Sequence, residues 1–139
     1  YEDLIFGGNK IVLSSSCIKK TFLLKTKKKF NENKNFFSVE DYDFWLKIAK
    51  HKGRFFLITK ILGTYNLNKH SISRKRIVHF LNTIYLLKTH EKFLKNRKLQ
   101  VIIRKLRIVI SFIKISFLEK NFDFLLFVLK FLISLKFLK

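Results

Sequence analysis

Three acidic residues, Glu40, Asp41 and Asp43, fall close together in a chain that contains only 9 acidic residues. A carboxylate in such a cluster can take a proton from a hydroxyl group and so act as a general base. The same pattern also suits an ordinary helix start. Ser38 and Asp41 have the spacing of a capping box, and the helix dipole favours carboxylates in a first turn by roughly 0.3–1 kcal/mol each. Both interpretations place the acids at the beginning of a helix.

The residues around this cluster predict the helix that carries it. Ser38 is a suitable N-cap, and Gly53 is well placed to end the helix. Between them an apolar stripe recurs at helical spacing and should face a core. Its members are Tyr42, Trp45, Leu46 and Ala49.

The segments on either side of this helix predict extended structure. Residues 9–13 form a short apolar run, 54–59 read as a strand, and 61–67 are a further extended candidate interrupted by a glycine. Residues 18–26 suit a short helix. Strands that alternate with helices in this way indicate an α/β unit, so we predict an α/β fold here.

The segment VEDYDFWLKIAK, residues 39–50, resembles the glutamate-aspartate motif of family 2 glycosyltransferases, which is followed by a glycine and an aromatic strand. The resemblance covers roughly residues 5–75. It implies that residues 1–73 are the C-terminal, acceptor-side part of a GT-A nucleotide-diphospho-sugar transferase domain. The flanking pieces that follow the family order are Asn9 and Ile11, Ser14-Ser15, Phe30-Asn31-Glu32, Leu62-Gly63 with Tyr65, and Ser71-Ile72-Ser73.

By this resemblance, Asp41 is the general base of an inverting sugar transfer. It would take the proton from an acceptor hydroxyl as that hydroxyl attacks the anomeric carbon of a nucleotide-diphospho-sugar. Glu40 would orient the base or bind the acceptor, and Asp43 is the alternative base. The implied partners are a nucleotide-sugar donor and a glycan or lipid-linked acceptor in cell-surface glycan synthesis.

Four further residues are implied in substrate binding. Trp45 is either a core residue or a platform for a sugar ring. Lys47 stands where the family often has arginine, and it either meets the diphosphate or is a solvated surface lysine. Ser14 and Ser15 match the turn before the acceptor helix.

The resemblance also implies Mg²⁺ or Mn²⁺ as cofactor, although the family's principal Asp-x-Asp ligands have no counterpart in this sequence. Asn68 occupies the position of a family histidine, and His70 follows two residues later, so these are the candidate metal ligands here. We expect the chain to be a fragment that lacks the donor-binding half. It should therefore be active only within a longer polypeptide.

The charge balance points to an anionic partner. The chain has 30 Lys and Arg residues and a net charge of +21, which suits phospholipid headgroups, nucleic acid or a phosphorylated substrate. The single cysteine, Cys17, cannot form an internal disulfide, and four dispersed histidines do not support a structural zinc site. We expect a reducing compartment, the cytoplasm.

Residues 74–139 predict a second part made of basic amphipathic helices, because they contain no glycine or proline. Between 100 and 117 the polar side chains share one face, which is typical of a helix that lies in a membrane interface. These polar residues are Gln100, Arg104, Arg107, Ser111 and Lys114. Residues 121–139 are more apolar and should lie on the membrane with snorkelling lysines, the alternative being a truncated spanning helix.

We therefore predict a peripheral protein at the inner face of the membrane, with an anionic membrane surface as partner. The alternative function is a non-enzymatic basic module that binds nucleic acid or an anionic membrane surface. The sequence lacks a recognisable nucleic-acid-reading motif, and its basic helix is too apolar for a soluble RNA binder. These features argue against nucleic acid.

Overall fold

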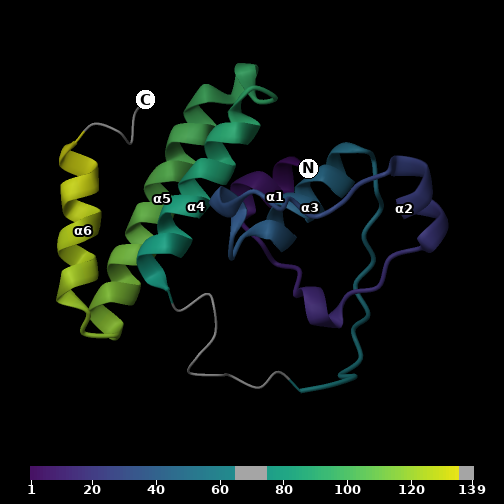
Figure 1. The fold of residues 1–139 in the computed structure, drawn as a ribbon, viewed down its shortest axis with the longest axis horizontal. Coiled ribbons are helices and arrows are strands. Elements are labelled where there is room, and N and C mark those ends of the chain that lie inside the picture. Colours follow the sequence, from purple (N-terminus) through teal and green to yellow (C-terminus); the bar gives the residue numbers. More distant parts are fainter. Residues whose placement is uncertain (65–74, 135–139) are drawn as a thin grey trace.

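The computed structural model describes residues 1–64 and 75–134, and every regular element in these ranges is helical (Figure 1). Longer helices alternate with single turns of 3₁₀ helix. In chain order the elements are α1 (Glu2–Gly7), η1 (Leu13–Ser15), α2 (Lys20–Thr26), η2 (Lys34–Phe36), α3 (Glu40–Lys50), α4 (Arg76–Glu91), η4 (Lys95–Arg97), α5 (Lys98–Leu118) and α6 (Phe122–Ile133).

The predicted α/β fold is wrong, because the described residues contain no strand. A strand needs a neighbouring strand to satisfy its backbone N–H and C=O groups. Residues 54–59 and 61–64 have no such neighbour in the described part of the chain, and they run as a single irregular segment. Residues 9–13 likewise form no strand, and η1 begins at Leu13. These segments contain the apolar residues that suggested strands, but no neighbouring strand pairs with them in the described residues.

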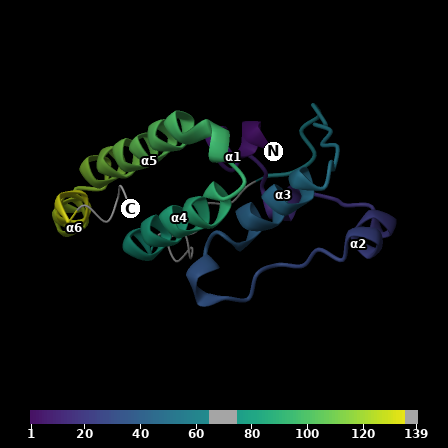
Figure 2. The ribbon, with the colours of Figure 1, turned by 90° about the horizontal axis from the view of Figure 1, so that it is seen from above.

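Helices α4, α5 and α6 pack against one another in the order α6, α5, α4, and α1 lies against α5 (Figures 1 and 2). Their shared core is built around Phe80, which is fully buried on α4. Its ring meets four phenylalanines of α5 and α6 edge-on, at centroid separations of 5.2 to 6.5 Å. These are Phe112, Phe124, Phe127 and Phe131.

Helix α3 lies between two apolar clusters, and this placement fixes its acids. Tyr42 and Leu46 join the core that contains α4, α5 and α6. Phe44, Trp45 and Ile48 form a second cluster, against which α2 and the segment before it pack. Since both sides of α3 are buried, the helix cannot rotate without breaking one cluster or the other.

The start of α3 differs from the predicted capping box. Ser38 has a positive φ of 68°, and Val39 occupies the N-cap position without a side-chain cap hydrogen bond. The Ser38 hydroxyl lies 3.0 Å from Nδ1 of His79 on α4 instead. The first turn of α3 is therefore tied to α4 by a long-range contact and not by its own sequence neighbours.

Candidate functional site

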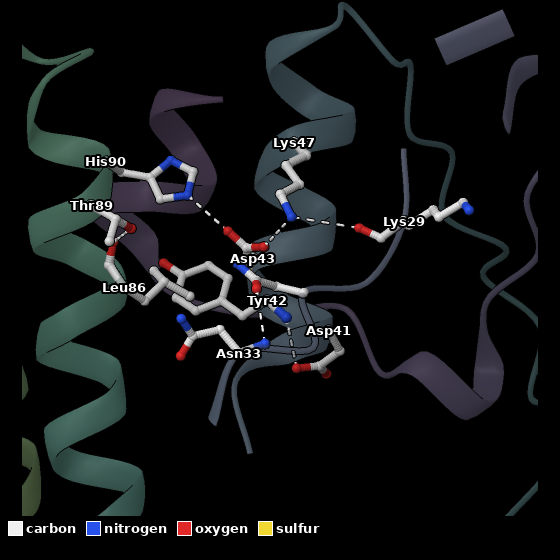
Figure 3. A network of polar contacts seen from close by, with 10 residues as sticks. Lys29, Asn33, Asp41, Tyr42, Asp43, Lys47, Leu86, Thr89 and His90 are labelled. Atoms are coloured by element: carbon white, nitrogen blue, oxygen red, sulfur yellow. Dashed lines mark hydrogen bonds and ion pairs between the residues drawn. The ribbon is translucent and has the colours of Figure 1, made fainter. Parts of the chain in front are cut away.

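The three clustered acids of α3 point to different surroundings, and the structure gives each a distinct role. Asp43 is the most buried of them, with 2% of its surface exposed. Its two carboxylate oxygens contact Lys47 Nζ at 2.6 Å and His90 Nε2 at 3.2 Å (Figure 3). Burial alone would raise the pKa of Asp43, but the hydrogen bonds from His90 and Lys47 outweigh burial and lower it. Asp43 is therefore a paired, ionised carboxylate.

His90 connects Asp43 to the first residue of the chain. The Tyr1 hydroxyl lies 2.7 Å from Nδ1 of His90. Burial raises the pKa of Tyr1 to about 12, so this hydroxyl stays protonated while it hydrogen-bonds with Nδ1. On the other side of the ring, Nε2 faces the ionised Asp43 carboxylate, which can only accept, so Nε2 is the donor of that hydrogen bond. The result is a polar chain, Tyr1, His90, Asp43 and Lys47, that links α4 and α3 to the residue before α1.

His90 and Tyr1 are not among the residues predicted from the sequence. A signal for His90 was present, because Phe80, Ile84, Leu87 and position 90 follow one another at helical spacing on the buried face of α4. A histidine that continues a buried stripe needs a polar partner, and Asp43 is that partner. Nothing in the sequence pattern pointed to Tyr1.

Asp41 is half-buried at the first turn of α3 and keeps a solvent-facing side. One carboxylate oxygen accepts the backbone N–H of Tyr42 at 2.7 Å, and the other accepts Nδ2–H of Asn9 at 3.1 Å. Burial raises the pKa of Asp41, although the hydrogen bonds from Tyr42 and Asn9 act in the lowering direction. This carboxylate is held in place but takes up a proton more readily than an ordinary aspartate.

Glu40 is the first residue of α3 and precedes Asp41. It is half-buried, and its Oε2 has no hydrogen-bond partner among the described residues. The negative charges of Asp41 and Glu40 act on nearby His79, whose pKa is nevertheless lowered, first by burial and then by Arg76. His79 is a second histidine at this site that the sequence analysis did not single out.

Three of the predicted substrate-binding residues, Trp45, Ser14 and Ser15, have no contact among the described residues that supports this role. Trp45 is 2% exposed and packs edge-on against Phe44 and Phe55, so its ring offers no face to a sugar. Of the two interpretations of Trp45, the structure supports the core residue. Ser14 and Ser15 are exposed in η1, and no hydrogen bond in the described ranges joins either to α3.

Lys47 lies at the edge of an open, cationic hollow of about 530 Å³. Besides its ion pair with Asp43, its Nζ reaches the Lys29 backbone carbonyl at 3.5 Å (Figure 3). Ammonium groups gathered in this way favour an anionic group such as a phosphate. The residues that line the hollow are Lys27, Lys28, Lys29, Phe30, Asn31, Glu32 and Lys47.

The candidate metal ligands Asn68 and His70 lie outside the described residues. Within residues 1–64 and 75–134, no group of three or more His, Cys, Asp or Glu side chains is placed to hold a metal ion. The acids of α3 do not fit a divalent cation, since Asp43 is committed to Lys47 and His90 and points away from Asp41. The predicted Mg²⁺ or Mn²⁺ therefore has no role in the chemistry derived below.

Comparisons of the chain with protein-family models, with curated proteins and with solved structures found no match. The functional argument therefore depends on the residues themselves. For the helices in the described ranges, none combines the length and the apolar character needed to cross a membrane.

Proposed function

We propose that this chain supplies the general base of an inverting glycosyltransferase, which moves a sugar from a nucleotide-diphospho-sugar to an acceptor hydroxyl. The proposal depends on the chemistry of α3 and not on any arrangement of strands. The observation that carries it is the difference between two aspartates of one helix. Asp43 is buried in an ion pair. Asp41 is oriented by hydrogen bonds and partly exposed to solvent, and its pKa is raised.

The environment of Asp41 suits proton abstraction. A sugar hydroxyl is a poor nucleophile, and a general base works best when its pKa approaches the working pH. Partial burial moves the pKa of Asp41 in that direction. The amide of Asn9 holds one carboxylate oxygen, and each oxygen retains lone-pair capacity for an incoming hydroxyl.

The chemical step is a single displacement. The acceptor hydroxyl gives its proton to the Asp41 carboxylate while its oxygen forms a bond to the anomeric carbon. The bond from that carbon to the diphosphate oxygen breaks on the opposite side, so the configuration inverts and the nucleoside diphosphate leaves. We assign Glu40, the neighbour of Asp41 in the first turn of α3, to orienting the base or hydrogen-bonding the acceptor.

We assign the cationic hollow beside Lys47 to the anionic part of the substrate. Lys28 is half-buried in its wall, and Lys47 keeps one N–H donor beyond those that face Asp43 and the Lys29 carbonyl. Replacing Lys28 with Gln should raise the KM for the donor severalfold with little change in kcat. The same change at Lys25, which is exposed on α2 and does not line the hollow, is the matched control.

We place the reaction at the cytoplasmic face of a membrane, with the protein bound peripherally and a glycan or lipid-linked acceptor as substrate. The support is the positive charge of the chain and the exposed apolar residues of its C-terminal helices.

Substitution of Asp41 with Asn in the native gene tests the proposal. Sugar transfer from labelled nucleotide-sugars in cell extracts should fall by roughly 10²–10⁴-fold, the usual contribution of a general base. Asp123, an exposed acid at the start of α6, provides a matched control, and Asp123→Asn should retain normal transfer. Transfer at the wild-type rate by Asp41→Asn, with the protein folded and present, would remove Asp41 as the base.

A further inference from the structure

The outer face of α5 is apolar although it is exposed. Leu99, Ile103, Leu106 and Ile110 follow one another at helical spacing, and all four are exposed. The opposite face is buried in the core through other residues, among them Ile108. The exposed stripe is therefore extra apolar surface that the fold itself does not use.

Helix α6 repeats the same arrangement. Phe122, Leu126, Leu129 and Ile133 have the same spacing as the α5 stripe, and all four are exposed. The buried residues Phe124 and Val128 attach α6 to the core on its other side. The two helices follow each other through a short turn and pack together, so the α5–α6 hairpin carries two exposed apolar stripes (Figure 1).

Exposed cations border both stripes. On α5 these are Arg107 and Lys114, in the turn Lys120, and on α6 Lys130. Of the acids, Glu119 is ion-paired with Arg76 of α4, which leaves Asp123 as the exposed acid of α6. The predicted basic stripe is partly different in the structure, because half-buried Arg104 turns toward Gly8 and Tyr42 in the interior.

We propose that the α5–α6 hairpin docks the protein on an anionic lipid surface, with both apolar stripes in the acyl boundary and the bordering Lys and Arg side chains among the headgroup phosphates. This inference rests on the peripheral location given above and identifies the surface and lipid chemistry responsible. An apolar helical face bordered by cations is typical of helices that lie in a membrane interface. The long stems of Lys and Arg let their charged ends reach the phosphates while the helix stays partly immersed.

The cations beside the two stripes favour an anionic lipid surface over a second copy of the chain as the partner. A second copy of this chain would bring Arg107, Lys114, Lys120 and Lys130 against the same cations, since the chain as a whole carries +21. Anionic headgroups attract each of these cations instead. The acids of the hairpin are Asp123 and Glu119, and Glu119 is already ion-paired with Arg76, so two such copies have little acidic surface to compensate these cations.

Flotation of the full chain with lipid vesicles tests the proposal without any sugar donor, so its outcome is independent of the transfer reaction. The wild type should bind vesicles that contain phosphatidylglycerol and bind pure phosphatidylcholine weakly. Replacing Leu106 and Ile110 together with Ser should weaken binding by at least about tenfold. Leu24→Ser, at an exposed leucine of α2, is the matched control and should bind like wild type.

A charge variant separates the two halves of the interaction. Arg107→Gln with Lys114→Gln should weaken binding to anionic vesicles by about tenfold or more and leave binding to neutral vesicles unchanged. Circular dichroism checks that each variant is folded. Wild-type binding by the folded Leu106 and Ile110 variant overturns the proposal. A stable dimer without vesicle binding, dissociated by the same variant, also overturns it and assigns the stripes to self-association.

Discussion

Replacing Asp43 with Asn should destabilise the protein, because Asp43 is the charged centre of a buried chain of contacts. In the variant, the oxygen of the new side-chain amide can still accept a hydrogen bond from His90. Its NH₂ group then faces the Lys47 ammonium, whose Nζ lies 2.6 Å from a carboxylate oxygen in the wild type. Hydrogen bonds to charged groups contribute about 1.5–3 kcal/mol, and breaking a buried ion pair costs about 3–5 kcal/mol. Since the Lys47 side chain is 31% exposed, water partly replaces the lost carboxylate. We expect a loss of about 2–3 kcal/mol in the free energy of unfolding.

Urea unfolding of the full chain at neutral pH measures this change. Trp45 is the single tryptophan and is buried, so its fluorescence reports on the packing around α3. Asp41→Asn is the matched control, the same substitution two residues earlier on the same helix. Because folding raises the pKa of Asp41, its charge is not stabilised by the fold. The control should stay within about 1 kcal/mol of wild type.

The effect should also depend on pH. Folding lowers the pKa of Asp43, so its stabilising contribution is complete above the unfolded value of 3.8 and is lost as the pH falls through the lower folded value. The difference in unfolding free energy between wild type and Asp43→Asn should therefore shrink as the pH falls below 3.8. Equal unfolding free energies at neutral pH, or an equal loss in Asp41→Asn, would refute the division of roles between the two aspartates.

Three further predictions follow from buried or strained positions. Phe80→Ala should cost about 3–5 kcal/mol of stability by urea unfolding, whereas Leu81→Ala, at the partly exposed next position, should cost much less. Gly8→Ala should cost about 1–3 kcal/mol, because Gly8 has a φ of 91° and a guanidinium close to the new methyl group. Gly63→Ala, which meets nothing within 4 Å, should leave stability unchanged. The rate of sugar transfer should rise with pH through the pKa of Asp41, which lies above 3.8, and a rate independent of pH in the acid range would contradict the proposed base.

The helices were predictable because their signals are local. The stripe from Tyr42 to Ala49 predicted α3, and the structure has it over Glu40–Lys50. The long helices after residue 75 and a short helix within 18–26 also form as expected. Each of these signals lies within a few turns of one helix, so the helix could be predicted without knowing which other segments pack against it.

The sequence could not decide whether strands form. An apolar run such as 54–59 is compatible with an extended segment, but it does not show whether a second strand lies beside it. Ser38 shows the same limit at a single residue. Its spacing to Asp41 satisfies the capping box, but a contact with His79, far along the chain, takes its hydroxyl and leaves the N-cap to Val39. Local rules failed at both places where a distant partner decided the conformation.

The candidate site depends on the same kind of long-range contact. Sequence spacing alone makes Asp41 and Asp43 equivalent, since both fall in the first turn of α3. Tyr1 and His90 approach Asp43 from outside α3, and Asn9 approaches Asp41. The contacts of Asp43 with His90 and Lys47 bury and pair its carboxylate, whereas Asn9 orients the Asp41 carboxylate and leaves one side open. A base needs both a fixed direction and an unoccupied face, and for Asp41 the amide of Asn9 and the backbone N–H of Tyr42 provide the fixed direction.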